Sequence, residues 1–263
     1  MKKRNKTMNR TSELFIELVE VVRKLRKECP WDREQTHKSI RHNLIEEAYE
    51  TVEAIDNDDF EELKRELGDL LLHVVMHSIM AEEGGKFTLD DVISLIKEKL
   101  VYRHPHVFGD LKVDNSKEVK HNWEKLKQSE NNRDSVISGI PKSLPALIKA
   151  YRVQEKASSV GFDWKHPDDV WKKVEEEIKE LKRTIQTNEQ NKIEEEFGDL
   201  LFAIVNYSRF LKINPESALN RAIEKFTRRF QSIERELKSR GKDIYSTTLE
   251  EMDEIWEKVK RNE

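Results

Sequence analysis

The chain has 263 residues, of which 48 are Lys or Arg and 52 are Asp or Glu, so its formal net charge is −4. Charged residues make up 38% of the sequence, against about 25% in an average globular protein, and there are only eight glycines and six prolines. This composition favours helices with ion-paired surfaces and argues against an all-β fold. The balance of charge argues against a nucleic-acid partner, because a general nucleic-acid binder is strongly basic.

Cysteine content and apolar run length bear on location. The single cysteine, Cys29, permits neither an intramolecular disulfide nor a cysteine metal cluster, which fits a reducing compartment. The longest apolar runs, 70–72 and 200–205, are far shorter than the about 18 residues of a membrane-spanning helix. The sequence therefore predicts a cytoplasmic protein that does not associate with a membrane.

Apolar residues recur with the helical period of 3.6 along most of the chain, so we predict an all-α fold. Proline, glycine and Asn-Asp breakers separate the predicted helices. These are expected around 14–25 and over 40–55, 59–83, 88–103, 146–158, 167–187, 190–211, 215–240 and 248–261. Residues 129–145 carry turn chemistry and little periodicity. They are the predicted linker between an N-terminal domain, 10–128, and a C-terminal domain, 146–263.

The two halves contain a repeat with an offset of 130 residues. Glu46-Glu47-x-x-Glu50 corresponds to Glu176-Glu177-x-x-Glu180, and Glu66-x-Gly68-Asp69 corresponds to Glu196-x-Gly198-Asp199. Between 46–75 and 176–205, ten of thirty positions are identical, including all five acidic motif positions. We interpret the repeat as a duplicated unit, so the fold is expected to contain two tandem helical units.

An isolated Glu-rich helix face is usually only solvated, but these acids share a different pattern. Like charges three or four residues apart repel on a helix, and the helix around Asp69 is apolar on almost every side. With a turn near 57/58, an antiparallel hairpin brings Glu50 level with Glu66 and Glu47 level with Asp69. The second copy repeats this arrangement around 187/188 with Glu177, Glu180, Glu196 and Asp199.

Four converging carboxylates fit a hard divalent cation, Mg²⁺ or Mn²⁺. A ferritin-like di-iron site is disfavoured, because it needs Glu-x-x-His on two helices. His73 and His77 lack the glutamate of a zinc-protease motif and are expected in the core or an interface. Each apolar hairpin needs a partner surface, so we expect the metal-binding hairpins to complete a four-helix bundle within or between subunits.

These motifs resemble the all-α nucleoside triphosphate pyrophosphohydrolases of the MazG type in their two-copy form. The carboxylate pattern alone is shared with dimeric dUTPases and phosphoribosyl-ATP pyrophosphatases, but flanking strings make the resemblance specific. They are Cys29-Pro30-Trp31-Asp32-x-x-Gln35-Thr36, Arg103-His104-Pro105-His106-Val107-Phe108, Val160-Gly161-Phe162-Asp163-Trp164 and Lys225-Phe226-x-Arg228-Arg229-Phe230.

The resemblance implies Mg²⁺-dependent cleavage of a nucleoside triphosphate into a nucleoside monophosphate and pyrophosphate by a homodimer of broad specificity. It implies metal ligands at Glu47, Glu50, Glu66 and Asp69 and at their four second-copy equivalents. Glu46 and Glu176 are then candidates for a base or for orienting water or ligand. The candidate substrate contacts are Arg103, His104, Trp123, Lys127, Glu176, Glu195, Asp199, Lys225, Arg228, Arg229 and Trp256.

Two other hypotheses for the function stay open. A narrow-specificity relative such as a dUTPase would carry the same acids, and a non-enzymatic oligomerisation or regulatory module could use acidic hairpins structurally. Basic residues such as Arg228 are as often surface ion-pair partners, and a tryptophan at helical spacing is more often a core residue. Both copies keep every acidic motif position, and the denser basic set slightly favours the second as the active one.

Overall fold

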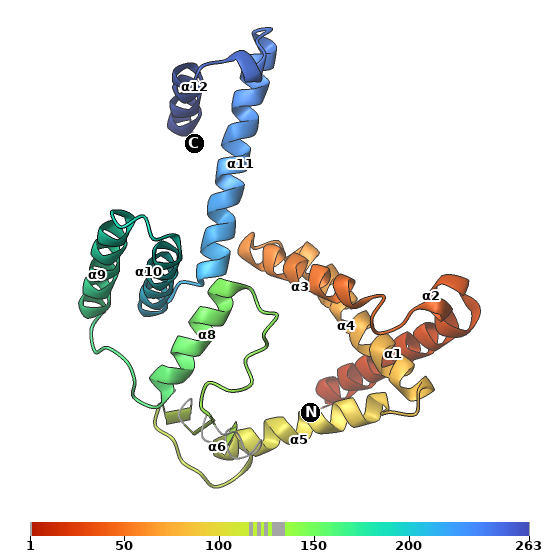
Figure 1. Cartoon of the computed structure of the whole chain (residues 1–263). Coiled ribbons are helices and arrows are strands. Elements are labelled where there is room, and N and C mark those ends of the chain that lie inside the picture. Colours follow the sequence, from red (N-terminus) through yellow and green to blue (C-terminus); the bar gives the residue numbers. More distant parts are fainter. Residues whose placement is uncertain (1, 116–117, 120–121, 124–125, 128–134, 263) are drawn as a thin grey trace. The chain divides into compact units, whose positions relative to one another are not determined.

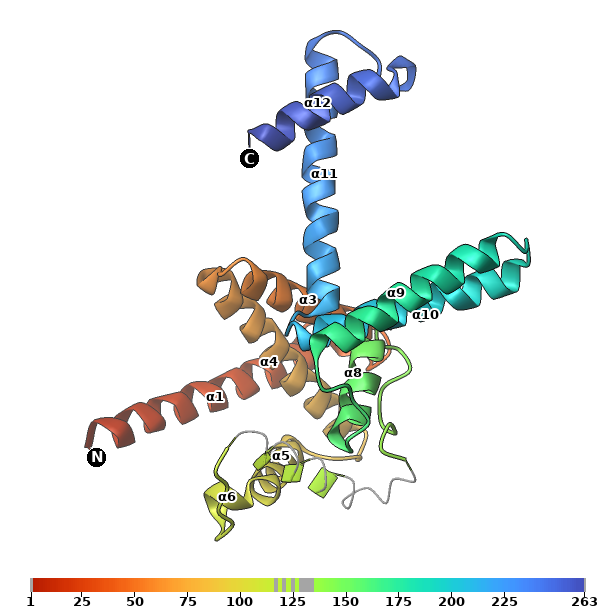
Figure 2. The same ribbon diagram turned by 90° about the vertical axis from the view of Figure 1, so that its left-hand side faces the viewer.

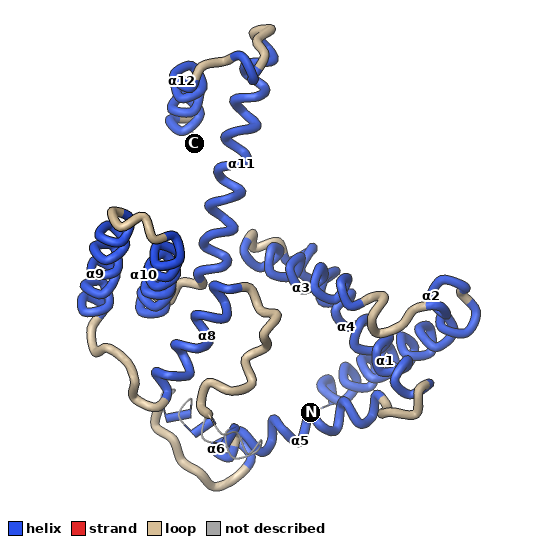
Figure 3. The backbone as a smooth tube through the Cα atoms, in the orientation of Figure 1, coloured by secondary structure: helices blue, strands red, loops and turns tan. Residues whose placement is uncertain are grey.

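The computed structural model describes residues 2–115, 118–119, 122–123, 126–127 and 135–262, and every regular element in these ranges is helical. The chain divides into two compact units, Met1–Trp123 and Glu124–Glu263. Figure 1 colours them along the sequence, and Figure 3 separates helix from loop. The predicted all-α fold is confirmed, whereas residues 129–134 of the predicted linker lie outside the described ranges. Among the described helices, none has the length and apolar character needed to cross a lipid bilayer.

Unit 1 is built on an antiparallel helix pair. Its elements are α1 (Lys2–Glu28), α2 (Pro30–Glu34), α3 (Arg41–Asp56), α4 (Phe60–Glu83), α5 (Leu89–Arg103) and α6 (Pro105–Phe108). Helices α3 and α4 form the hairpin, and α1 packs against α4 around the buried Val22, Val75 and Ile79. Ion pairs from Arg23 and Arg26 to Glu82 and Glu83 fasten α1 to the end of α4. The α3–α4 hairpin is therefore packed against α1 through its second helix, α4.

Unit 2 repeats the hairpin and adds a long helix. Its elements are α8 (Ala146–Ser159), α9 (Pro167–Ile185), α10 (Gln190–Phe210), α11 (Pro215–Ser239), the 3₁₀ turn η1 (Ile244–Ser246) and α12 (Leu249–Arg261). Helix α10 packs between α9 and α8, and α12 packs on α11 (Figure 2). A small separate core of Ile233, Leu237 and Ile255 holds α11 and α12 together. Unit 2 thus has one apolar centre at the hairpin and another at the α11–α12 junction.

The duplicated sequence folds into duplicated hairpins. Helices α4 and α10 begin at Phe60 and Gln190, which are 130 positions apart. The two hairpin turns contain Asp58 and Asn188 with φ of 53° and 54°, again 130 positions apart. Asp and Asn tolerate this left-handed conformation better than most side chains do. The repeat therefore extends to the backbone conformation of the turn.

The hairpins carry apolar side chains that one chain leaves exposed. On α3 and α4 these include Leu44, Ile55 and Leu67, and on α10 they include Leu201 and Ile204. The described parts of each unit do not cover these faces, although large apolar patches are uncommon on monomeric proteins. The expected four-helix bundle is therefore not completed around these faces by the described residues of a single unit.

Candidate functional site

The first carboxylate cluster joins the two helices of the α3–α4 hairpin. Glu47 comes from α3 and Glu66 and Asp69 come from α4, and one carboxylate oxygen of each lies within 4.8 Å of the others. Glu66 is buried, and its Oε2 atom has no hydrogen-bond partner among the described residues. Since a buried anionic oxygen is costly when unpaired, this atom points to a missing cationic partner.

The second cluster has the same construction but includes a lysine. Glu177 on α9 and Glu196 and Asp199 on α10 bring carboxylate oxygens within 4.8 Å of one another. The Lys173 ammonium, one turn before Glu177, lies 2.8 Å from Glu177 Oε1 and 2.7 Å from Glu176 Oε1. These contacts raise the pKa of Lys173, so the lysine stays charged. The second cluster is therefore partly neutralised by its own chain.

Two predicted ligands, Glu50 and Glu180, lie outside these trios but act on them electrostatically. Burial, followed by repulsion from Glu50, raises the pKa of Glu66 to about 7. In the second copy, burial and then Glu180 raise the pKa of Glu196. In each hairpin, therefore, the negative charge of the carboxylates is not fully balanced by neighbouring positive side chains among the described residues.

The residues present fit a hard divalent cation. All donors in both trios are carboxylate oxygens, which Mg²⁺ and Mn²⁺ prefer over the softer metals. The unpaired Oε2 atom of Glu66 and the raised pKa of Glu66 are what a binding site shows when its positive partner is absent. Three protein carboxylates also leave room in a six-coordinate shell for water and phosphate oxygens.

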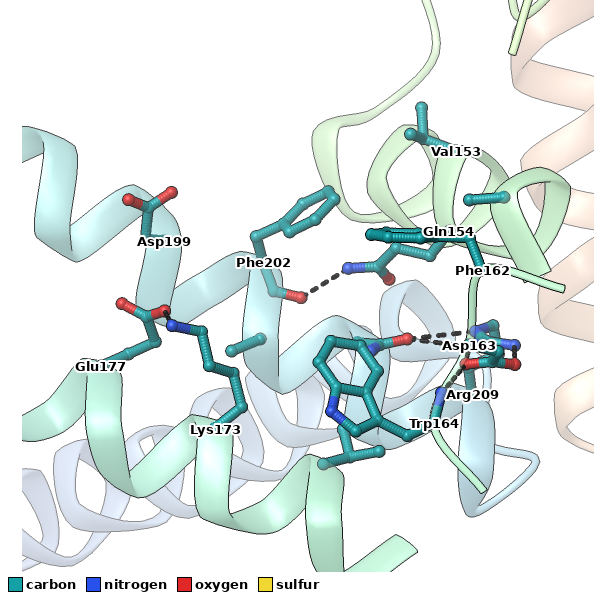
Figure 4. A pocket seen from close by; sticks show the side chains of 14 residues that line it. Val153, Gln154, Phe162, Asp163, Trp164, Lys173, Glu177, Asp199, Phe202 and Arg209 are labelled. Atoms are coloured by element: carbon teal, nitrogen blue, oxygen red, sulfur yellow. Dashed lines mark hydrogen bonds and ion pairs between the residues drawn. The ribbon is translucent and has the colours of Figure 1, made fainter. Parts of the chain in front are cut away.

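A cavity of about 410 Å³ opens beside the second cluster, and Figure 4 shows its lining. Glu177, Asp199 and Lys173 lie at one end, and aromatic side chains including Phe162, Trp164 and Phe202 line the rest. This combination of a charged end and apolar walls is typical of sites for small molecules that carry both kinds of group.

The opposite wall of this cavity is fixed by a network of polar contacts. The Arg209 guanidinium donates to both carboxylate oxygens of Asp163, at 2.9 and 2.5 Å, and to the buried Asn206 Oδ1. Gln154 donates its amide to the Phe202 carbonyl at 2.8 Å, which leaves the buried Gln154 Oε1 without a partner in the described chain. An unpaired buried acceptor in a cavity wall is a group that a ligand can satisfy.

The corresponding cavity in the first copy is smaller, at about 170 Å³. Positions 203 and 206 are Ala and Asn in the second copy, whereas the larger His73 and Met76 occupy the equivalent positions in the first. The first cluster also lacks the lysine, because Asn43 stands where the second has Lys173. The two copies thus share the carboxylates but differ in the space and charge beside them.

Several predicted substrate residues lie away from this cavity. Trp256 packs in the α11–α12 core against Phe226, with their ring centroids 5.3 Å apart, and the Arg229 guanidinium lies over its ring. Lys225 and Arg228 belong to the same helix, α11. None of these four lines the cavity. Their role as substrate contacts stays a prediction.

The remaining predicted site residues lie beside the carboxylate trios or on other elements. Glu46 and Glu195 are exposed neighbours of the carboxylate trios, and Glu176 is paired with Lys173. Arg103 ends α5, and His104 Nδ1 lies 2.6 Å from the Leu100 carbonyl oxygen. Trp123 is partly exposed and does not line the cavity of unit 1, and Lys127 does not line that of unit 2. Their roles as substrate contacts stay predictions.

Lys173, Gln154 and Arg209 are among the residues of the second site that were not predicted from the sequence. Lys173 carries a local signal, since a lysine four residues before a glutamate pairs with it on a helix. Gln154 and Arg209 carry none, because α8 and the end of α10 reach the cavity only through tertiary packing.

An all-helical protein with two carboxylate hairpins, each suited to a divalent cation, is the class that fold and site define. The model of the MazG nucleotide pyrophosphohydrolase domain matches this chain twice, over residues 35–108 and 166–233. The matches include every residue of both carboxylate trios. The chain belongs to the MazG nucleotide pyrophosphohydrolase family, which confirms the resemblance seen in the sequence.

Curated relatives match over most of the chain. The nucleoside triphosphate pyrophosphohydrolase/pyrophosphatase MazG of Thermotoga maritima is 48% identical over 257 residues, covering 96% of this chain and 98% of the relative. The nucleoside triphosphate pyrophosphohydrolase of Escherichia coli K12 is 45% identical, covering 89% and 91%. An uncharacterized Bacillus subtilis protein, YabN, is 46% identical over 92% of this chain but only 51% of its own length.

Proposed function

We propose that the second carboxylate cluster catalyses hydrolysis of nucleoside triphosphates to nucleoside monophosphates and pyrophosphate, with Mg²⁺ or, in its place, Mn²⁺. The observation that carries this proposal is the cavity where Glu177 and Asp199 meet Lys173 beside aromatic walls. The family and the names of the relatives support the reaction class. The first cluster has the carboxylates but a smaller cavity and no equivalent lysine, so we assign turnover to the second.

The protein's own residues supply binding and orientation. Glu177, Glu196 and Asp199 hold the cation, with Glu180 adding negative charge nearby. A bound Mg²⁺ neutralises phosphate charge and makes a water molecule more acidic. With Glu177 engaged in holding the cation, the Lys173 ammonium would be available to pair with a phosphate oxygen in the cavity. Water attacks the α-phosphorus, the bond to the β-phosphate oxygen breaks, and Glu176 stays our candidate for accepting the proton or orienting the water.

The remainder of the cavity supports broad base specificity. Phe162, Trp164 and Phe202 offer apolar and aromatic surface on which any nucleobase can lie. Gln154 Oε1 is an acceptor without a partner among the described residues and would accept from an exocyclic amino group or a ring N–H, whereas Arg209 already binds Asp163 and Asn206. Apolar walls with few directional partners discriminate weakly among similar ligands. We therefore propose that ribo- and deoxyribonucleotides with different bases are all hydrolysed.

We also propose that the active form is a homodimer. The exposed apolar faces of the hairpins and of α11, where Leu219, Ile223 and Phe226 are about half exposed, support this state. Association of two copies would bury these faces as a four-helix arrangement.

Pyrophosphate and orthophosphate release from a panel of nucleoside triphosphates, with Mg²⁺ or with EDTA, tests the function. We expect Mg²⁺-dependent pyrophosphate, and no orthophosphate, from most members of the panel. Activity confined to dUTP would favour the narrow dUTPase reading instead. Absence of pyrophosphate with every nucleotide would contradict the enzyme proposal and leave the structural module.

A further inference from the structure

Three histidines of unit 1 form a chain of rings outside the carboxylate trio. His37 lies in the turn before α3, and His73 and His77 lie one turn apart on α4. The Nδ1 atoms of His37 and His77 are 2.8 Å apart, with their rings within 7° of parallel and their centroids 5.1 Å apart. The His73 and His77 centroids are 5.9 Å apart. The chain leads from the exposed His37 to the buried His73.

Two nitrogen atoms of this chain lack partners. His73 Nδ1 and His77 Nε2 are both buried, and neither has a hydrogen-bond partner among the described residues. The His73 side chain is only 8% exposed. Buried polar atoms are nearly always paired in folded proteins, so these two atoms, which are distinct from the Nδ1 pair of His37 and His77, indicate a water or ligand beside that pair. Imidazole nitrogens are also the commonest protein ligands of transition metals.

The histidine chain is not part of the duplicated machinery. At the equivalent positions, 130 residues later, the second copy has Pro167, Ala203 and Tyr207. The carboxylate trio, by contrast, is present in both copies. The histidine chain is therefore particular to unit 1. Burial, followed by the neighbouring His37 and His73, lowers the pKa of His77 and favours the neutral ring that binds metals.

We propose that His37 and His77, with His73 behind them, bind a borderline transition-metal ion such as Zn²⁺, at a site distinct from the hard-cation carboxylate clusters. In a tetrahedral zinc site with Zn–N bonds of about 2.0–2.1 Å, two ligand nitrogens lie roughly 3.3 Å apart. The two Nδ1 atoms at 2.8 Å are hydrogen-bonded to each other, so the rings must both turn and separate by about half an ångström for their lone pairs to meet at one ion. His37 allows this movement because it is exposed and lies in a turn.

Isothermal titration of tag-free protein with Zn²⁺, in saturating Mg²⁺ to occupy the carboxylates, tests this site. We expect one Zn²⁺ per chain, with affinity reduced at least about tenfold in His37→Ala and in His77→Ala. Two control variants should leave the affinity for Zn²⁺ unchanged. They are His42→Ala, which removes an exposed histidine at the start of α3, and Glu66→Gln. Histidine ring resonances that shift with Zn²⁺ in the wild type and not in His37→Ala provide a second readout.

Three results would overturn the proposal. They are no Zn²⁺ uptake in saturating Mg²⁺, uptake that His37→Ala and His77→Ala leave intact, or uptake that Glu66→Gln abolishes. The last result would place the ion on the carboxylates. Because His37 is exposed, His37→Ala keeps the test valid even if His77→Ala fails to fold.

Discussion

Lys173 is the residue that most clearly separates the two carboxylate clusters in charge. Its ammonium contacts Glu176 and Glu177, whereas the first cluster has the uncharged Asn43 at the equivalent position. A cation on a ligand carboxylate competes with a metal ion for the same oxygen. The lysine therefore weakens metal binding by the substrate-free protein, and in the proposed reaction it becomes useful once phosphate is present.

Substitutions at positions 173 and 43 test this role of the lysine. Lys173→Met should raise the Mn²⁺ affinity of the second cluster and lower turnover by about tenfold or more, because one charge-assisted phosphate contact is lost. Asn43→Lys should lower the metal affinity of the first cluster and leave turnover unchanged. Titration of bound Mn²⁺ by electron paramagnetic resonance, with steady-state kinetics, measures both. Lower Mn²⁺ affinity in Lys173→Met would contradict the competition.

The raised pKa of Glu66 gives the metal-free protein a pH dependence with a defined sign. The pKa of Glu66 is about 7 in the folded chain and about 4.5 in the unfolded chain, so folding favours its protonated form. The contribution to stability is complete below about pH 4.5 and is lost as the pH rises through 7. In EDTA, the melting temperature should therefore fall from pH 5 to pH 8, and less steeply in Glu66→Gln.

Added metal should reverse this trend. A cation binds the ionised carboxylate, so at pH 6 its uptake releases a proton from Glu66 and its affinity rises toward pH 8. Calorimetry in buffers of different ionisation enthalpy counts the released protons. Metal uptake at pH 6 without proton release would contradict the assignment of Glu66 as a ligand.

At the residue scale, the sequence predicts which carboxylates converge better than it predicts which other side chains line the cavity. The carboxylates share fixed helical spacings, and the same offset of 130 places both motif pairs, so their convergence follows from helix geometry. Glu50 and Glu180 were expected in the clusters, but they act from just outside them. Gln154 and Asn206 were not predicted, because which amide faces a cavity depends on how α8 and α10 pack.

At the scale of elements, the hairpin turn sets the register of the carboxylates. Asp58 and Asn188 hold a left-handed conformation that costs most L-residues about 1–2 kcal/mol. Asp59 caps α4 by accepting from the Glu61 and Glu62 amides. The turn therefore fixes where α4 begins and so which residues of α4 face Glu47.

Substitutions at the two turns should have matched effects. Asp58→Val and Asn188→Val should each lower the free energy of unfolding by about 1–2 kcal/mol, because a β-branched side chain resists positive φ. Asp58→Gly and Asn188→Gly should cause no such loss, since glycine adopts this conformation freely. Urea unfolding measures all four variants. Equal loss with Val and Gly would show that the side chain, and not the backbone conformation, matters at these positions.

Most elements follow from local sequence signals, and the exceptions have a physical cause. Helices were predicted over 88–103 and 215–240, and the structure begins α5 after a capping box of Thr88 and Asp91 and α11 after the capping residue Asn214. Helix α1 extends from Lys2, well before its apolar period begins near residue 14. Met8 is the one apolar residue in the sequence of residues 2–13, so apolar periodicity gives no signal for the start of this helix.

At the scale of the whole molecule, the exposed apolar faces are the feature that a single chain does not explain. The α3–α4 and α9–α10 hairpins and α11 all keep large apolar side chains exposed. The sequence predicts that these faces need partners, but periodicity does not say whether the partner is the same chain or another. We expect a homodimer, with a sedimentation coefficient independent of concentration in the micromolar range.

Charged substitutions on one of these faces test that state. Leu67→Glu with Leu71→Glu should dissociate the dimer, because burying two unpaired carboxylates is costly. Analytical ultracentrifugation measures the change, and Glu61→Gln on the exposed start of α4 is the control. A wild-type chain that sediments as a monomer would contradict the dimer but not the catalytic proposal.

The assignment of catalysis to the second carboxylate cluster is the central claim, and paired ligand substitutions test it most directly. Glu177→Gln and Glu47→Gln remove the same ligand from the two copies, 130 residues apart. The measurement is Mg²⁺-dependent pyrophosphate release by each variant, with circular dichroism confirming that both are folded. We predict that Glu177→Gln loses at least about 100-fold in turnover, since even outer-shell partners of a metal cost about 10–100-fold, while Glu47→Gln stays close to wild type. Full turnover by folded Glu177→Gln, with loss in Glu47→Gln, would contradict the account.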